Sequence, residues 1–145
     1  MNVEIRPFSI KSYDAVYALW QECEGIGLSQ ADSRERIKAY LKRNPGMSYI
    51  AVSGNVLVGA VLGGHDGRRG YIHHLAVDPG YRRRSLGRRL IQRCLKALAQ
   101  ASIQKCHLFV MNHNREAMAF WQSVGWTPRK DISVMSRNID PEPAC

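Results

Sequence analysis

One stretch of the chain, residues 71–91, restricts the fold more than any other, because three structural signals follow one another in it. Residues 71–77 are mostly apolar, aromatic or β-branched, a composition typical of a buried strand. The tripeptide Asp78-Pro79-Gly80 then predicts a turn. After it, apolar residues recur at three- and four-residue steps in a basic segment, as in an amphipathic helix: Leu86, Leu90, Ile91, Leu95 and Leu98.

The junction between this strand and this helix is suited to bind a phosphate. The free N–H groups of a first helical turn and the positive end of the helix dipole favour an anion. Six arginines lie close to this junction: Arg82, Arg83, Arg84, Arg88, Arg89 and Arg93. The alternative is a solvated helix face, but cations at a helix N-terminus oppose the dipole by about 0.3–1 kcal/mol. A bound anion would relieve that conflict.

Length and composition indicate an ordinary globular protein with an anionic partner. The 145 residues are 45% hydrophobic and 23% charged, and 21 Lys and Arg against 12 acids give a net charge of +9. Such a balance favours nucleic acid, anionic lipid or a phosphorylated ligand. We expect one domain over residues 1–139 and a disordered tail over 140–145.

Neither a transmembrane helix nor a secretory signal is expected, which predicts a cytoplasmic protein without a membrane partner. The four cysteines lack metal-ligand or redox spacing and are expected to be free thiols.

The remaining segments predict a mixed-sheet α/β domain. Short apolar runs predict strands at 3–7, 49–52, 56–62, 106–111, 126–128 and 132–135. Helical spacing of apolar residues predicts helices at 12–23, 33–43 and 117–124. Residues 63–67, Gly-Gly-His-Asp-Gly, predict a turn before the strand at 70–78. This order of elements predicts helices on both faces of the sheet.

Two motifs in this chain resemble those of the GNAT superfamily of acyl-CoA-dependent N-acyltransferases. The phosphate-loop pattern of that family, Gln/Arg-x-x-Gly-x-Gly/Ala, corresponds to residues 82–87. A second pattern, Asn-x-x-Ala-x-x-Phe-Tyr-x-x-x-Gly-Phe, corresponds to residues 114–126. The resemblance covers nearly the whole chain and implies a mostly antiparallel central sheet. It also implies transfer of an acetyl group from acetyl-CoA to a primary amine, by direct attack through a tetrahedral intermediate.

The resemblance implies where acetyl-CoA would bind. Its pyrophosphate would lie on the backbone N–H groups of residues 83–88, and its pantetheine arm beside residues 75–77, where this strand splays from the strand at 106–111. The N–H of Val77 would bind the thioester oxygen and then the oxyanion. The implied cofactor contacts are Leu75, Ala76, Val77, Arg82, Arg83, Arg84, Ser85, Leu86, Gly87, Arg88, Asn114, Ala117, Phe120 and Trp121.

Two positions depart from the family patterns. Ser85 stands where the family usually has its first glycine, and it is tolerated if its φ is negative. Trp121 stands where many members have a tyrosine proposed to protonate the leaving thiolate, and an indole N–H is not a usable acid. Because a thiol of pKa about 8.5 leaves readily as the thiolate, we expect a working catalyst.

The attacking amine must lose a proton, and the strand offers two histidines that could receive it. Regular alternation would place Tyr71, His73 and Val77 on one face and His74 on the other. His73 is therefore the first candidate base and His74 the second, while Tyr71 could orient a water. The alternative is that His73 only packs and that bulk water takes the proton. No metal site is expected, because neighbouring histidines on a strand point apart, and no cysteine nucleophile is expected.

The sequence leaves the acceptor open. Residues 24–48 would border it and carry mixed charge, so a protein N-terminus, a lysine, a polyamine, an aminoglycoside and an amino acid all remain candidates. Two other functions compete: a CoA-binding sensor without catalysis, suggested by Ser85 and Trp121, and a nucleic-acid-binding protein that uses the arginines. Against nucleic-acid binding, the chain has no aromatic residues interleaved with these arginines, as proteins that stack on bases have. A homodimer is neither required nor excluded.

Overall fold

The computed structural model describes residues 2–140, and the chain divides into two compact units at the boundary between Phe109 and Val110. Among the described residues, the first unit contains the sheet and three α-helices, and the second contains one α-helix. The part of the predicted tail at 141–145 lies outside the described residues. No described helix is long and apolar enough to cross a membrane.

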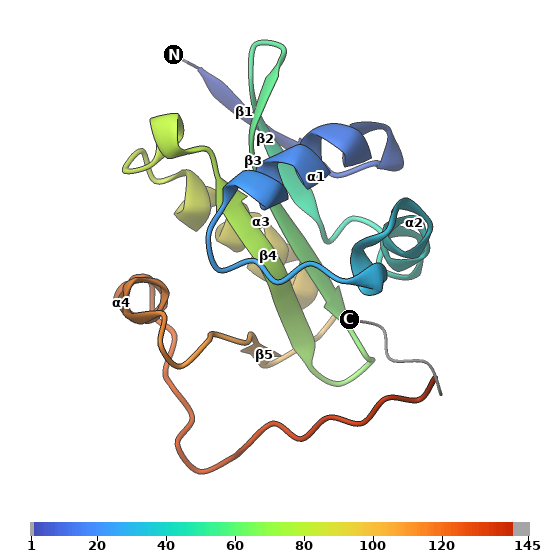
Figure 1. Ribbon diagram of the computed structural model, residues 1–145, viewed down its shortest axis with the longest axis vertical. Helices are drawn as coiled ribbons and strands as arrows, with labels where there is room; N and C mark the ends of the chain where they lie inside the picture. Colours follow the sequence, from blue (N-terminus) through green and yellow to red (C-terminus); the bar gives the residue numbers. More distant parts are fainter. Residues whose placement is uncertain (1, 141–145) are drawn as a thin grey trace. The chain divides into compact units, whose positions relative to one another are not determined.

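The first unit is built on one five-stranded sheet whose strands lie in sequence order (Figure 1). The strands are β1 (Val3–Pro7), β2 (Tyr49–Ser53), β3 (Val56–His65), β4 (Gly70–Val77) and β5 (Cys106–His107). Neighbours pair antiparallel except β4 and β5, which pair in parallel through two residue pairs. The predicted mixed, mostly antiparallel sheet is therefore confirmed, although the predicted strand at 106–111 is reduced to two residues.

Helices cover both faces of this sheet, as the sequence predicted. In Figure 1, α1 (Tyr13–Glu22) and α2 (Arg34–Arg43) lie in front of the strands and α3 (Leu86–Gln100) behind them. Two glycines of β3 mark the opposite faces: a Cβ on Gly64 would meet the Tyr40 hydroxyl of α2, and one on Gly59 would meet Leu90 of α3 at 3.1 Å.

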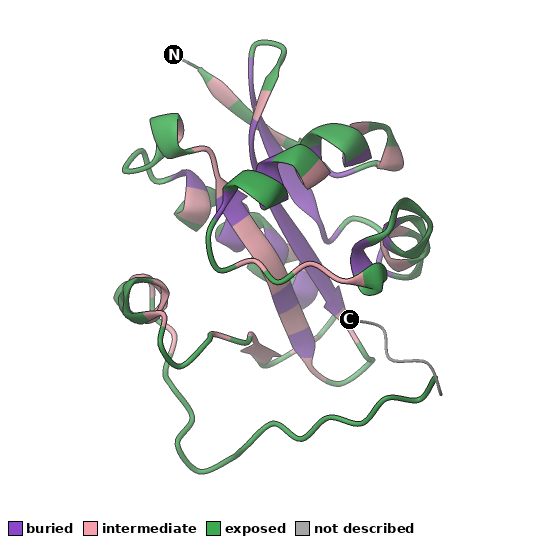
Figure 2. Ribbon diagram, viewed as in Figure 1, coloured by how far each residue is buried: buried purple, intermediate pink, exposed green. Residues whose placement is uncertain are grey.

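The core fills both spaces between helices and sheet, and Figure 2 shows burial concentrated in the central strands. On the side of α1 and α2, Trp20 is 1% exposed and packs with Ile37 and Leu62. On the other side, α3 buries Leu86, Leu90, Ile91, Cys94 and Leu98. The predicted apolar face of α3 included Leu95, which is 37% exposed. Cys94 is buried in its place, because a position four residues after Leu90 lies on the same helix face.

The turn predicted at 63–67 is wrong in its first half, because β3 continues through Gly63 and Gly64 to His65. Both glycines serve close packing within the strand. A Cβ on Gly63 would clash with the carbonyl oxygen of Met47, and the Gly63 N–H donates to the buried Ser48 hydroxyl at 3.0 Å. The two glycines therefore admit a neighbouring backbone and a side chain close to the strand.

We expect Gly63→Ala to lower the free energy of unfolding by about 1–3 kcal/mol, because the added methyl would force the Met47 backbone to move. Urea denaturation followed by circular dichroism would measure this loss. Gly27→Ala is the matched control, since nothing lies within 4 Å of a Cβ at Gly27. Equal stability of both variants would contradict the close approach at Gly63.

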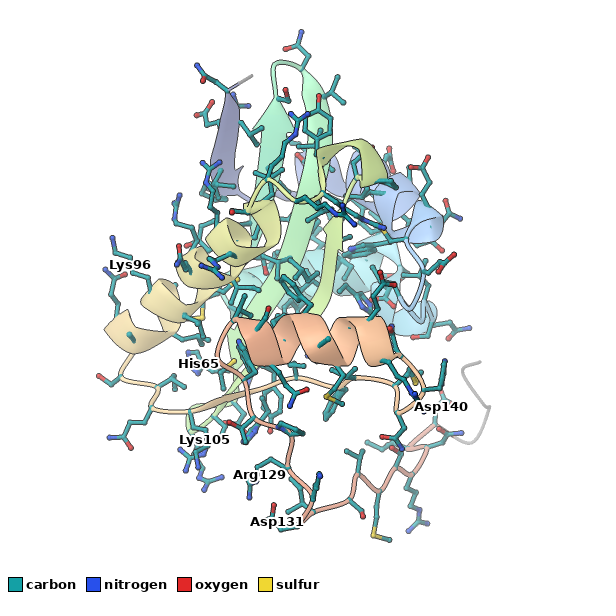
Figure 3. All side chains as sticks on the ribbon, turned by 90° about the vertical axis from the view of Figure 1, so that its left-hand side faces the viewer. His65, Lys96, Lys105, Arg129, Asp131 and Asp140 are labelled. Carbon is teal, nitrogen blue, oxygen red and sulfur yellow. The ribbon has the colours of Figure 1, made fainter. Side chains whose placement is uncertain are left out.

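The second unit contains helix α4 (Arg115–Ser123) and an extended C-terminal segment. In that segment Arg129 makes a two-point ion pair with Asp131, at 3.0 and 2.9 Å (Figure 3). No strand forms in the described residues after β5, so the strands predicted at 126–128 and 132–135 are wrong. Alternating apolar residues suit a sheet only where one face is buried, and here Ile132 and Val134 are 56% and 68% exposed.

Candidate functional site

A β-bulge in β4 determines which side chains face which helices. His73 pairs with Leu62 and Ala76 pairs with Ala60, so two residues of β4 lie opposite one residue of β3. His74, inside the bulge, has a φ of +52°. Because residues directly opposite each other share a face, His73 and Ala76 both face α1 and α2.

The predicted alternation along β4 is therefore wrong after His73. Val77 pairs with Gly59 on the face of α3, so it does not share a face with His73. His74 faces α1, because its ring lies 5.0 Å from that of Trp20. The bulge thus brings both histidines to the same face, with ring centroids 6.5 Å apart. Among the described residues, no group of three potential metal ligands forms around them.

His74 makes a buried contact that the sequence did not predict. Its Nε2 lies 2.8 Å from Oδ1 of Asp32, whose side chain is 8% exposed. Asp32 also accepts the Ser29 N–H at 3.1 Å through Oδ2, in a capping box around residues 29–32. The Trp20 indole N–H donates to the His74 carbonyl oxygen at 3.2 Å. Asp32 lies in the mixed-charge segment 24–48, and only the folded chain brings it to β4.

His73 lies in a cluster of aromatic rings beside this pair. Its ring is parallel to that of Tyr71 at 6.3 Å, 6.2 Å from Phe109 and 6.4 Å from Tyr40. Burial lowers the pKa of His73, the neighbouring His74 lowers it further, and Asp32 opposes this shift in part. His73 is therefore held in its neutral form to lower pH than an ordinary histidine. It can line a binding surface, but it is poorly placed to keep a proton.

The outer edge of β4 is open along the half that leads to the basic loop. β5 pairs only with Gly70 and Tyr71, so within the described residues no strand pairs with the β5 side of β4 beyond Tyr71 (Figure 1). The Asp78 N–H donates to the Val58 oxygen at 2.8 Å. Hydrogen-bonded and non-hydrogen-bonded pairs alternate along an antiparallel ladder, so the preceding pair, Val77 with Gly59, is not hydrogen-bonded. The Val77 N–H therefore points away from β3, toward this open edge.

The loop after β4 exposes a row of backbone N–H groups. Asp78 caps a short 3₁₀ helix, Pro79–Tyr81, by accepting the Gly80 N–H at 2.8 Å. Residues 83 and 85 both have positive φ, and the first hydrogen bond of α3 runs from the Arg89 N–H to the Ser85 oxygen at 3.0 Å. No hydrogen-bond acceptor among the described residues takes the N–H groups of residues 83–88. Such a row at a helix N-terminus is suited to bind an anion.

Only some of the arginines predicted to bind phosphate have side chains free of other contacts. Arg82 folds back on the strand, where its Nε donates to the Val77 oxygen at 3.1 Å. Arg84 lies over the ring of Tyr81, 5.2 Å from its centroid. Arg83 and Arg88 are exposed and have no hydrogen-bond or ion-pair partner among the described residues. They are the arginines best able to reach a phosphate.

The condition on which Ser85 was expected to be tolerated is not met, because its φ is +63°. An L-residue in the left-handed region is strained, and glycine there is not. We expect Ser85→Gly to raise the free energy of unfolding by about 0.5–1 kcal/mol, since relief of strain exceeds the added freedom of the unfolded chain. Thermal unfolding would measure the gain. Ser85→Ala, which keeps the Cβ, should show none; an equal gain would contradict this explanation.

The second motif builds the helix of the second unit. Asn114 caps α4 by accepting the Ala117 N–H at 3.0 Å, so its side-chain oxygen has a structural partner. The Trp121 ring lies 5.4 Å from Phe120 and 5.3 Å from Trp126. Gly125, with φ +101°, follows the end of the helix. Phe120 and Trp121 are thus part of one aromatic cluster, and cofactor contact by these residues stays a prediction.

The cysteines of the described chain are free thiols, as expected. Burial raises the pKa of Cys94 to about 12 and that of Cys106 to about 11. Neither forms a thiolate near neutral pH, so neither is suited to act as a nucleophile.

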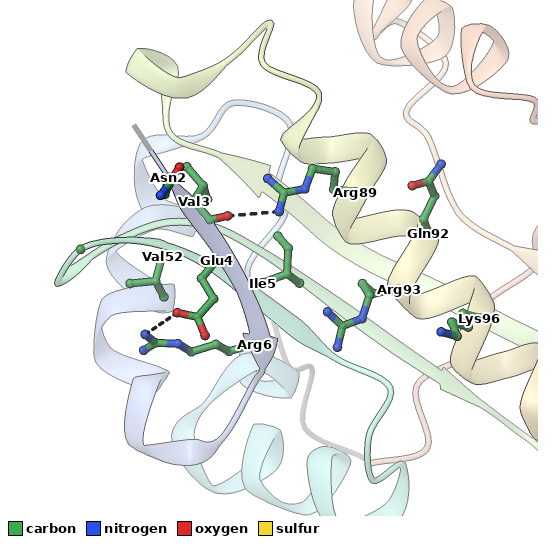
Figure 4. A pocket seen from close by; sticks show the side chains of 11 residues that line it. Asn2, Val3, Glu4, Ile5, Arg6, Val52, Arg89, Gln92, Arg93 and Lys96 are labelled. Atoms are coloured by element: carbon green, nitrogen blue, oxygen red, sulfur yellow. Dashed lines mark hydrogen bonds and ion pairs between the residues drawn. The ribbon is translucent and has the colours of Figure 1, made fainter.

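A cavity of about 750 Å³ lies between β1 and α3 (Figure 4). Arg89, Arg93 and Lys96 of α3 line one side of it, and Arg89 donates to the Val3 oxygen at 3.1 Å. None of the residues predicted to bind acetyl-CoA or to act in catalysis lines this cavity.

Comparison with known proteins places this geometry in a family. Residues 13–126 match the acetyltransferase (GNAT) family. An acetyltransferase of Pectobacterium atrosepticum is 30% identical over 138 residues, which cover 95% of this chain and 97% of the relative.

Two solved structures share the fold. The PaiA N-acetyltransferase of Thermoplasma acidophilum, solved in complex with coenzyme A, has a TM-score of 0.78 at 19% identity, covering 88% of this chain and 91% of that one. The structure of AAC(6')-Iy in complex with the bisubstrate analogue CoA-S-monomethyl-acetylneamine has a TM-score of 0.76 at 13% identity, covering 95% and 99%. The chain therefore belongs to the GNAT acetyltransferase family and is an acyl-CoA-dependent N-acetyltransferase.

Proposed function

We propose that this acetyltransferase moves the acetyl group of acetyl-CoA directly to a primary amine, at the open edge of β4. One observation carries the proposal. The edge of β4 beyond Tyr71 has no partner strand, and the chain passes from this edge directly into residues 83–88, whose N–H groups have no acceptor in the described chain. A thioester whose diphosphate binds the loop would bring its acyl end back along β4.

Each part of the donor has a place in this arrangement. The diphosphate would accept hydrogen bonds from the N–H groups of residues 83–88, with Arg83 and Arg88 beside it. The pantetheine arm would lie along residues 75–77. The Val77 N–H, which points to the open edge, would bind the thioester oxygen and stabilise the oxyanion that forms on attack. Asn114, Ala117, Phe120 and Trp121 stay candidates for contacts along the CoA arm.

Direct transfer is favoured over a covalent enzyme intermediate. A ping-pong route needs a nucleophile, and burial keeps Cys94 and Cys106 protonated, with pKa values of about 12 and about 11. The leaving group needs no acid from Trp121, because a thiol of pKa about 8.5 departs as the thiolate. The protein would thus accelerate the reaction chiefly by alignment and by stabilising the oxyanion.

The amine would approach from the face of α1 and α2, where Tyr71 and His73 lie with Phe109 and Tyr40. The π faces of such rings attract a cationic amine. A cationic amine is therefore the acceptor class that this surface favours, and a primary amine belongs to it. We place the enzyme in the cytoplasm, which fits the free thiols Cys23, Cys94 and Cys106.

An amine panel assayed with acetyl-CoA tests the proposal. The panel contains a peptide with a free N-terminus, a lysine peptide, a polyamine, an aminoglycoside, an amino acid and an aromatic monoamine. Release of CoA thiol with at least one of them, together with acetylated product by mass spectrometry, is expected. Tight CoA binding in calorimetry without turnover of any amine would instead favour a CoA-binding sensor.

A further inference from the structure

We propose that His74, held by Asp32, is the residue that receives the proton of the acceptor ammonium. This inference rests on the proposed function and assigns one chemical step of it. The sequence alone ranked His73 ahead of His74. Three observations on the folded chain reverse that order: the left-handed backbone conformation of His74, its buried carboxylate partner, and access of solvent to its second ring nitrogen.

The first observation is the conformation of His74. A φ of +52° is uncommon for a residue with a side chain, and residues held there cluster at functional sites. This conformation, inside the bulge, turns the His74 side chain to the face of α1, the face that His73 also takes. Trp20 fixes this conformation by packing against the ring at 5.0 Å and by donating to the His74 oxygen.

The second observation is the orientation of the imidazole. Oδ1 of Asp32 lies 2.8 Å from Nε2, and Oδ2 is held by the Ser29 N–H. A carboxylate accepts only, so the neutral imidazole must carry its hydrogen on Nε2. The lone pair is then on Nδ1. A buried carboxylate that fixes the tautomer of a histidine is the arrangement by which a histidine serves as a base.

The third observation is that Nδ1 can be reached. The His74 side chain is 19% exposed, and no described residue forms a hydrogen bond with Nδ1. Every fully buried side-chain nitrogen or oxygen in the described part of the chain has a hydrogen-bond partner. Because Nδ1 has none, it is not fully buried and is open to solvent. His74 also lies three residues before Val77 on β4, a span of about 10 Å that the amine and one water can bridge.

The charges favour His74 over His73 as the proton acceptor. A proton on His74 would form an imidazolium directly paired with the Asp32 carboxylate. A proton on His73 would be buried among Tyr71, Tyr40 and Phe109, beside a second imidazole, and burial already lowers its pKa. His73 therefore serves as a wall of the acceptor surface, and His74 as the base.

The proposed step balances as follows. Nδ1 of His74 takes one proton from the ammonium, directly or through one water, and the freed lone pair forms a C–N bond with the thioester carbon. The C–S bond then breaks and the thiolate leaves. The second amine proton passes to the thiolate, and the imidazolium returns its proton to solvent. The net products are the amide, CoA thiol and one proton.

The test compares asparagine variants in kinetics with an amine that the wild-type enzyme acetylates. Asparagine tolerates positive φ, so His74→Asn keeps the bulge. We expect kcat to fall about 10²–10⁴-fold, the range for loss of a positioned base, with unchanged acetyl-CoA affinity in calorimetry. Asp32→Asn should also lower kcat without raising the acetyl-CoA KM. His65→Asn, at the far end of β3, is the control and should keep wild-type activity.

A second variant separates chemistry from structure. His74→Gly suits the backbone and leaves a space the size of the ring, so added imidazole should restore part of its activity, while it should not restore His73→Asn. Full activity in His74→Asn, or loss without rescue in His74→Gly, would overturn the assignment of the base. Wild-type enzyme that binds CoA but acetylates no amine would overturn the proposed function, and this inference with it.

Discussion

Gly87→Val is expected to raise the KM for acetyl-CoA about a hundredfold, the cost typical of displacing a bound group by about 1 Å. Gly87 lies in the first turn of α3, among the N–H groups that have no acceptor in the described chain. Without a side chain, the backbone there can be approached closely by a phosphate. A valine would hold the diphosphate away from the row of N–H groups, and steady-state kinetics with varied acetyl-CoA would measure the change.

The fold should tolerate this change, which makes the result interpretable. Gly87 is not among the residues with positive φ, and valine is a better helix residue than glycine by a few tenths of a kcal/mol. The melting temperature should therefore stay near that of the wild type. Gly87→Ala, with a smaller side chain, should raise KM less. A normal KM in Gly87→Val would refute the assignment of residues 83–88 to the diphosphate.

Trp20→Ala is expected to lower the free energy of unfolding by about 3–5 kcal/mol, the range for removing a buried aromatic side chain. Trp20 is 1% exposed and lies at the centre of the packing between α1 and the sheet. Its removal would also leave the His74 carbonyl oxygen without its indole donor. Chemical denaturation of the purified variant would measure the loss.

Trp20→Phe is the matched control, because it keeps most of the apolar volume and removes the N–H donor. We expect a smaller loss, about 1–2 kcal/mol, in which the unpaired carbonyl and the reduced packing both contribute. If the alanine and phenylalanine variants were equally stable, the packing of Trp20 between α1 and the sheet would not be the main contribution of this residue.

Much of the site was predictable from sequence because its signals are local. The run before Asp78, the Pro-Gly turn and the helical spacing after it predicted strand, loop and helix, and β4 and α3 confirm them. A row of free N–H groups also follows from local geometry, since any helix leaves its first N–H groups unbonded. The cap that Asn114 forms on α4 is also local, because its side-chain oxygen accepts the N–H of Ala117, three residues later.

The wrong predictions depended on contacts between distant segments. Gly63 and Gly64 suggested a turn, but the backbone of Met47 and the side chains of α2 require glycine inside a strand. The alternation at 132–135 suggested a strand, but alternation without a partner forms none. Ser85 was expected to be tolerated only at negative φ, and its φ is +63°.

The sequence by itself determined the order of elements as far as α4, the loop between β4 and α3, and the family, because periodicity, turn residues and helix termini act over a few neighbouring positions. Only the tertiary structure decided which histidine faces which partner. The bulge in β4 depends on its register with β3, and the carboxylate of Asp32 reaches His74 across 42 positions of the chain. Register and long-range contact arise from packing of the whole core, which no short segment encodes.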